Sequence, residues 1–373
     1  MIFLGISVAF FLLGQIGRAS FNQQEINLYL YEVPYSIWVA YNLFIKGRIL
    51  RLRKESLVLL AILVTTYLLG LSRVSIPANF VSLLYLLRLS AYIMGFEIVV
   101  DQVKKNNISQ KFVQVSIFLL GVTGVIQYFL YSNLRNLQYL GWDPHQSRVF
   151  GQFFDTSVAG AVYGLILVFL LFRRNLFKPW LKNWIYPITY FLLGLFTYSR
   201  GYLLSIFSAA AFYSLYFYRN VKLLGIAAVL IAGFVFLAPK PFGEGVKLLR
   251  TSTIESRLVD YRQGIGLFQK NPFVGVGYNR IRYFRPVETF ANSGLSHAGA
   301  SFHSSYLIIA VTSGAIGLGV FLYWLFMTLR MSKFALISGV FIGVYSLFDN
   351  ILLHPFILFL WPITIGLISR KKQ

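Results

Sequence analysis

A single histidine and a few arginines have the residue types and positions for chemistry at a phosphate. His303 follows the one long polar segment, residues 239–302, and opens the apolar run that begins at Ser304. A histidine at such a boundary is neutral near pH 7 and can accept a proton from a hydroxyl group. An isolated interfacial histidine is more often a hydrogen-bonded anchor, so the assignment of His303 to chemistry depends on its neighbours.

Three arginines have unusual positions. Arg200 precedes Gly201 between two apolar runs so close together that the turn must lie at a membrane surface. Arg148 lies just before Gly151 at the start of another run, and Arg257 begins a helical apolar face within the polar segment. A guanidinium group binds a phosphate through two parallel hydrogen bonds, which strengthen in a partly dehydrated site. The alternative is an arginine that snorkels to lipid headgroups, which we favour less for Arg200 because of its glycine turn.

Other residues can serve the same chemistry. Asp349, in the turn between the last two apolar runs, can accept a hydrogen bond from His303 and hold its ring. Arg88 lies inside an apolar run, ~13 Å along a helix from Glu97 and too far to pair with it. We expect Arg88 to line a groove or to pair with another span. The polar segment adds further candidates for substrate binding: Arg262, Arg280 and Tyr278.

The sequence favours chemistry without a metal or a cofactor. The polar segment holds no Asp-x-Asp motif, and the chain has no cysteine, which excludes a thiolate metal site and a thiol nucleophile. Glu288, His297 and His303 are a weak alternative as a zinc site, because the histidines lie six residues apart on a loop of undefined structure. We therefore predict a metal-independent site.

The composition is that of a membrane protein. Of the residues, 57% are hydrophobic, 18% aromatic and only 12% charged, far from the range of soluble domains. The net charge of +22 does not indicate nucleic acid, because the basic residues punctuate apolar runs instead of forming one water-facing surface. Residues 2–17 have no basic segment before them and no cleavage site after them, so they are predicted to be a first span.

The apolar runs predict an all-α, polytopic fold. A bilayer needs roughly 20 apolar residues per helix, which gives about twelve transmembrane helices in a single membrane domain, residues 1–373, with the loop 239–302 as its external catalytic part. The expected spans are 2–17, 27–45, 57–72, 77–100, 112–131, 155–172, 184–198, 201–218, 223–238, 304–329, 334–348 and 351–368.

The distribution of lysine and arginine predicts the orientation. One alternate set of short loops, together with the C-terminal tail, holds most of the basic residues outside the long loop. By the positive-inside rule both termini are cytoplasmic and the long loop is external. Long segments translocate largely regardless of charge, so the basicity of this loop calls for a local explanation such as an anionic substrate.

Taken in order, these motifs resemble the bacterial O-antigen ligase and Wzy-type polysaccharide polymerase family. The resemblance covers roughly residues 148–330 by motif, and the whole chain by span number and loop position. The residues that carry it are Arg148 with Gly151, Ser199-Arg200-Gly201, Arg257, Asn271-Pro272-Phe273-Val274-Gly275-Val276-Gly277, His303-Ser304-Ser305-Tyr306-Leu307 and Ser313-Gly314-Ala315-Ile316-Gly317.

The resemblance implies a GT-C-like glycosyltransferase of the bacterial inner membrane. Members move a glycan from an undecaprenyl-diphosphate carrier to an acceptor hydroxyl, on a glycan or a lipid, at the external face. The family implies a catalytic role for His303 and diphosphate handling for Arg200 and Arg257. The chain departs from the pattern at Ser304, where the family often has asparagine. Polymerase and ligase both remain open.

Elementary chemistry agrees with this expectation. Sugar transfer from a diphosphate requires stabilisation of the leaving group and partial deprotonation of the incoming hydroxyl, which arginines and His303 can supply. Direct, inverting transfer follows if no carboxylate of the protein attacks the sugar first. The alternative is a transporter or flippase of lipid-linked glycan. Transporters commonly contain inverted repeats, whereas this sequence concentrates its polar residues in one loop.

Overall fold

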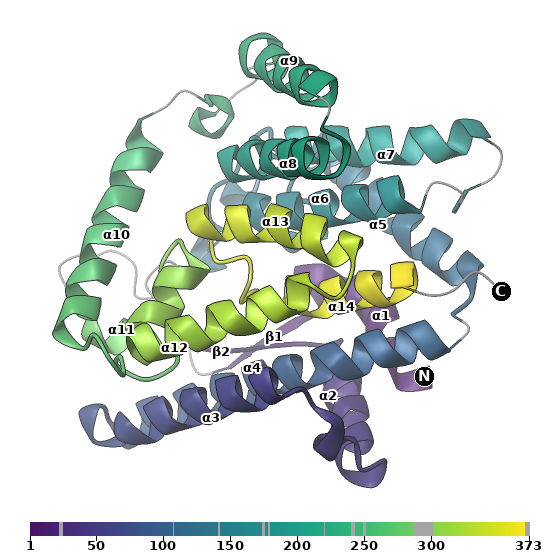
Figure 1. The fold of residues 1–373 in the computed structure, drawn as a ribbon. Coiled ribbons are helices and arrows are strands. Elements are labelled where there is room, and N and C mark those ends of the chain that lie inside the picture. The colour runs from purple at the N-terminus through teal and green to yellow at the C-terminus, as the bar shows by residue number, and fades with distance from the viewer. Residues whose placement is uncertain are drawn as a thin grey trace.

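A computed structural model describes most of the chain. The described residues are 1–21, 25–106, 108–140, 142–173, 176–177, 180–219, 221–239, 243–248, 251–285 and 301–369. In them the chain is mostly helical, with one pair of short antiparallel strands (Figure 1). The helices and strands are α1 Ile2–Phe11, β1 Arg18–Phe21, β2 Ile26–Tyr29, α2 Glu32–Ala40, α3 Lys54–Leu69, α4 Ile76–Lys105, α5 Gln110–Leu130, α6 Thr156–Phe172, α7 Trp180–Leu195, α8 Arg200–Phe212, α9 Val221–Leu237, α10 Ser252–Lys270, α11 Ile281–Phe284, α12 Ser305–Leu329, α13 Lys333–Phe348 and α14 Pro355–Ser369.

The helices have the lengths and composition of a multi-pass membrane protein. Among the described residues, 5 helical segments are long and apolar enough to cross a bilayer. They are Lys54–Arg73, Ile76–Lys105, Gln110–Leu130, Arg200–Tyr218 and Ser305–Leu329, and the shorter apolar helices are Ile2–Phe11, Thr156–Phe172, Leu224–Leu237, Lys333–Phe348 and Pro355–Ser369.

One expected span begins later than the sequence predicts. Residues 26–29, which include the predicted start of the second span, form strand β2 and pair with β1 in the register Arg18 to Tyr29. Helix α2 begins only at Glu32. The all-α prediction is therefore wrong for this hairpin, because hydropathy alone cannot distinguish a short apolar strand from the first turn of a helix.

The centre of the bundle is made by α6 and α14. Helix α6 is buried from Val158 to Leu170, and α14 packs against α4 and α6 (Figure 1). The ring of Trp361 in α14 meets Phe96 of α4 edge to face, with ring centroids 5.4 Å apart. These contacts hold the helices that end around the site in fixed positions.

Arg88 and Glu97 of α4 pair with residues of other elements. Arg88 Nε lies 2.6 Å from Glu32 Oε1 of α2, and the Tyr92 hydroxyl donates to the same oxygen. Towards the other end of α4, Glu97 pairs with Arg53, at 3.0 Å. The expectation that Arg88 pairs with another span is confirmed, and the pair joins α2 to α4.

The segment 271–277 is built into a break in α12. Gly314 interrupts that helix with φ 67° and ψ −171°. The amides of Val276 and Gly277 donate to the carbonyls of Val311 and Thr312 at 3.0 and 2.8 Å, and the amide of Ala315 donates to the Pro272 carbonyl at 2.7 Å. The loop therefore satisfies the backbone groups that the break leaves unpaired. Gly275 and Gly277 of this segment therefore have a structural role, and their backbone contacts anchor the loop to the bundle.

Gly314→Ala should destabilise the protein. A Cβ atom at Gly314 would lie 2.1 Å from the Phe273 carbonyl oxygen, at a positive φ that costs a non-glycine residue about 1–3 kcal/mol. We expect a lower melting temperature for the detergent-solubilised variant. In the same helix, Gly319→Ala has nothing within 4 Å and should keep or raise stability. Equal melting temperatures for the two variants would contradict this role of the break.

Candidate functional site

The site begins with a buried carboxylate on the loop helix α10. Asp260 accepts the backbone amide of His303 at 2.7 Å and lies 3.0 Å from Nδ1 of the same residue, both through Oδ2. Its side chain is 6% exposed and that of His303 is 40% exposed. With Nδ1 engaged by the carboxylate, Nε2 is the ring nitrogen that can accept a proton.

A third residue completes this arrangement. Arg285 pairs with Asp260 through Nη2, and its Nη1 donates to the Ser301 carbonyl at 2.9 Å. Its guanidinium also lies over the Phe302 ring, 4.6 Å from the centroid. Asp260 thereby ties α10 both to the segment after α11 and to the start of α12. Neither Asp260 nor Arg285 was among the sequence candidates. The spacing of three residues between Arg257 and Asp260 places them on one side of a helix and is the signal that could have found Asp260.

The pKa values of His303 and Asp260 are shifted by their surroundings. The hydrogen bond to Asp260 raises the pKa of His303 above its ordinary value; burial opposes this, and the charge of Asp349 adds to it. Burial alone would raise the pKa of Asp260, but the hydrogen bonds from His303 and the charges of His303 and Arg285 lower it below its ordinary value. Asp260 is therefore an anion at neutral pH, and His303 is a stronger base than a free histidine.

Asp349 pairs with one of the candidate arginines. Nη2 of Arg257 lies 3.5 Å from Oδ2 of Asp349, at the C-terminal end of α13. The guanidinium groups of Arg200 and Arg257 are close enough to repel each other, and the charges of Asp349 and Arg257 both act on His303. Arg257 is thus close to Asp349, to Arg200 and to His303. The expected hydrogen bond between Asp349 and His303 is not the one formed, since Asp260 approaches the ring from α10.

Helix α8 positions Arg200. Ser199 caps this helix with its side chain and accepts a hydrogen bond from the Tyr345 hydroxyl of α13 at 2.7 Å. A Cβ atom at Gly201 would lie 2.5 Å from the Tyr345 ring. The turn is therefore packed directly on α13, the helix that ends beside Asp349. The small residue after Arg200 is required for this approach.

The remaining candidates occupy different places. Arg148 is buried behind the turn, and its Nε donates to the Thr197 carbonyl at 2.7 Å. Arg262 is exposed on α10. Arg280 is fully buried and donates to the Tyr67 carbonyl at 2.9 Å and to the Asn79 side chain at 2.6 Å, which makes it a structural link between the loop and helices α3 and α4.

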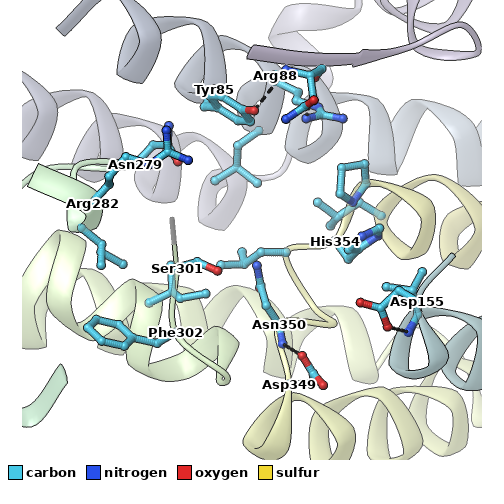
Figure 2. Close-up of a pocket in the computed structure, with 18 of the residues that line it drawn as sticks. Tyr85, Arg88, Asp155, Asn279, Arg282, Ser301, Phe302, Asp349, Asn350 and His354 are labelled. Atoms are coloured by element: carbon cyan, nitrogen blue, oxygen red, sulfur yellow. Dashed lines mark hydrogen bonds between the residues drawn. The ribbon is translucent and has the colours of Figure 1, made fainter. Parts of the chain in front are cut away.

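A cavity of about 360 Å³ adjoins His303 (Figure 2). It is enclosed by the β1–β2 hairpin, α4, the segment before α6, α11 and the turn between α13 and α14. Of the sequence candidates, His303, Asp349, Arg88 and Tyr278 line it. Arg148, Arg200, Arg257, Arg262 and Arg280 are not among its lining residues.

The described residues contain no group of three or more histidine, aspartate and glutamate side chains that could hold a metal ion. Two members of the zinc alternative, Glu288 and His297, lie outside the described residues.

Comparison with known proteins supports the family expected from the motifs. Residues 185–322 match the model of the O-antigen ligase family. Residues 185–322 are therefore similar to the O-antigen ligase family, in a chain whose described helices are those of a multi-pass membrane protein. The matched range contains Arg200, Arg257 and His303, whereas Arg148 and Asp349 lie outside it. A comparison with curated proteins finds no match.

The structure explains the serine that departs from the family pattern. Ser304 is the N-cap of α12, and its hydroxyl accepts the amide of Leu307 at 3.4 Å. Serine and asparagine are about equally good at this position, because both side chains offer an oxygen to the first helical amides. The residue after His303 therefore serves the helix start, and either side chain can do this.

Ser304→Ala should lower stability, and Ser304→Asn should not. Loss of the cap costs about 1 kcal/mol, whereas the asparagine oxygen can replace the hydroxyl. Thermal melting in detergent measures both. Ser109 is a matched control, because it stands at the N-cap of α5 without a side-chain cap hydrogen bond, and Ser109→Ala should change little. A Ser304→Asn variant as unstable as Ser304→Ala would exclude the capping explanation.

Proposed function

We propose that the protein transfers a saccharide from an undecaprenyl-diphosphate carrier to an acceptor hydroxyl, as a surface polysaccharide polymerase or O-antigen ligase. The observation that carries the proposal is the position of Arg257 beside Arg200, Asp349 and His303. Arg200, Arg257 and His303 lie in the region that matches the O-antigen ligase family. The twelve-span topology, the GT-C-like fold, the cytoplasmic termini and the external position of the site belong to the same proposal.

The arginine pair supports a diphosphate ligand. The positive charges of Arg200 and Arg257 repel each other, and Asp349 lies 3.5 Å from Arg257 as its ion-pair partner. A diphosphate would offset the remaining repulsion and accept several charge-assisted hydrogen bonds. During transfer, negative charge develops on the departing diphosphate, so these guanidinium groups stabilise the transition state more than the ground state.

His303 supports activation of the acceptor. The acceptor oxygen bonds to the anomeric carbon while the bond from that carbon to the diphosphate oxygen breaks. The hydroxyl proton moves to Nε2 of His303, and the diphosphate leaves with the bonding electron pair. Asp260, fixed at Nδ1, stabilises the imidazolium that forms. Direct displacement of this kind inverts the anomeric centre, and the proposal requires no metal or cofactor.

The same arrangement favours an enzyme over the alternative of a transporter or flippase. Movement of a lipid-linked glycan across a bilayer requires binding and release but no proton acceptor. A histidine whose ring is held by a buried, arginine-paired carboxylate is typical of acid–base catalysis. Product formation in liposomes that carry the lipid-linked glycan only in the accessible leaflet distinguishes the two functions.

Removal of the base or of either arginine should abolish transfer. With purified protein and lipid-linked glycan, we expect His303→Ala to lower the rate by about 10²-fold or more. Arg200→Ala and Arg257→Ala should each lower it by a similar factor. Lys270→Ala removes an exposed basic residue of the same loop helix and should keep full activity. Wild-type activity in His303→Ala, or its loss on addition of EDTA, would overturn the mechanism.

The pH dependence should report the Asp260–His303 pair. The wild-type rate should fall as the pH decreases through the raised pKa of His303, because a protonated ring cannot accept the hydroxyl proton. Asp260→Asn removes the anion that raises this pKa, so the acid limb should move to lower pH and the maximal rate should fall. Asp349→Asn should move the limb in the same direction by less, since the Asp260 hydrogen bond is the larger cause. An unmoved acid limb in Asp260→Asn would mean that His303 is not the titrating base.

A further inference from the structure

We propose that the cavity next to His303 is the binding site of the acceptor, and that it takes a neutral or amino sugar by hydrogen bonds to carboxylates and amides. This rests on the proposed function. Asp349 lines the cavity (Figure 2). His303 also lines it, whereas Arg200 and Arg257 are not among its lining residues. His303 therefore lies between this cavity and the Arg200–Arg257 pair, since the charge of Arg257 also acts on it.

The geometry of a direct displacement determines on which side of His303 each reactant lies. In a direct displacement the nucleophile approaches the anomeric carbon from the side opposite to the leaving group. The guanidinium groups must lie on the side of the leaving diphosphate, and the base on the side of the nucleophile. Since Arg200 and Arg257 lie outside the cavity and His303 lines it, the cavity lies on the side of the incoming hydroxyl.

The lining near His303 suits a sugar. Asp143, Asp155 and Asn350 line this part of the cavity, and all three offer oxygens to hydroxyl donors. Asp155 caps α6 through Oδ1, at 2.6 Å from the Ser157 amide, so Oδ2 remains as an acceptor. Asp143 is exposed and lines the cavity, so its carboxylate oxygens are open to a sugar hydroxyl that donates to them.

The far side of the cavity gives little attraction for an anion. Arg88 and Arg282 line it, but each is paired with a glutamate, Arg88 with Glu32 at 2.6 Å and Arg282 with Glu25 at 3.2 Å. Arg18 lies over the Trp142 ring, 4.4 Å from its centroid. Asp143, Asp155 and Asp349 also line the cavity. A neutral or amino sugar therefore fits the charge of the cavity better than an acidic sugar does. Its volume is within the ordinary range for small-molecule sites.

The absence of native cysteine allows a direct test. Tyr283 lines the cavity and is 37% exposed, so Tyr283→Cys offers a single reactive thiol at its wall. The control is Lys270→Cys, an exposed position of α10 that is not among the lining residues. Each variant is labelled with methyl methanethiosulfonate or with a bulky biotin maleimide. Glycan transfer is measured with lipid-linked glycan as donor and native membrane glycolipid as acceptor, and binding of undecaprenyl diphosphate is measured separately.

We expect the bulky label at Tyr283→Cys to lower transfer at least about tenfold while undecaprenyl diphosphate still binds. The methyl label should have a smaller effect, and the labelled control should keep both activities. Full transfer with the cavity blocked would overturn the proposal. Loss of undecaprenyl diphosphate binding would also overturn it, because the cavity would then belong to the donor.

A second variant avoids dependence on labelling. Asp143→Ala should raise KM for the acceptor, with little change in kcat at saturating acceptor and in undecaprenyl diphosphate binding. An unchanged acceptor KM, or a fall in kcat alone, would contradict a binding role. If the wild-type protein neither transfers glycan nor binds undecaprenyl diphosphate, the proposed function itself fails. If the wild type does both and the blocked variant also does, only the cavity assignment fails.

Discussion

The site depends on one buried carboxylate, Asp260. An anion removed from water is strongly unfavourable unless hydrogen bonds and opposite charges compensate it. Asp260 receives this compensation from residues far along the chain, namely Arg285 and His303. The need to satisfy one carboxylate therefore brings together the loop helix, the segment before α12 and the start of that helix. The same contacts fix the orientation of the imidazole, so the folding of the loop also positions the base.

Asp349 has the corresponding role on the arginine side of the site, because it pairs with Arg257. It stands at the C-terminal end of α13, where the partial negative charge of the helix adds to its own charge and favours a neighbouring cation. The hydroxyl of Tyr261 donates to the Leu347 carbonyl, which fastens α10 to the same helix end, one turn from Arg257. Ser199 and Gly201 fasten α8 to α13 from another direction. Two guanidinium groups that repel each other are thus held close together by contacts that do not involve their charges.

The sequence could predict those parts of the arrangement that leave a local pattern along the chain. Apolar length placed the helices at 201–218 and 304–329 close to their observed bounds, and a glycine turn identified Arg200 as an unusual surface arginine. It could not predict which carboxylate reaches His303, because that depends on the angle at which α10 crosses α12. Nor could it predict that Arg280, a candidate for substrate binding, is instead buried against Tyr67 by the fold of 271–277. Arg257, from the same loop, pairs with Asp349 beside the site.

The character of α10 explains why a soluble-looking loop can serve a membrane-anchored donor. Its face away from Asp260 exposes Ile254, Leu258 and Ile265, while basic and polar residues occupy the neighbouring positions. A helix with this division is typical of one that lies in the membrane interface with its apolar side towards the acyl chains. Figure 1 shows α10 at the edge of the molecule, and the helix packs against α12. In that position Arg257 would lie at the level of lipid phosphates. Under the proposed function, a diphosphate attached to a prenyl chain would reach Arg257 there without leaving the bilayer, while the acceptor sugar would reach His303 from the polar cavity.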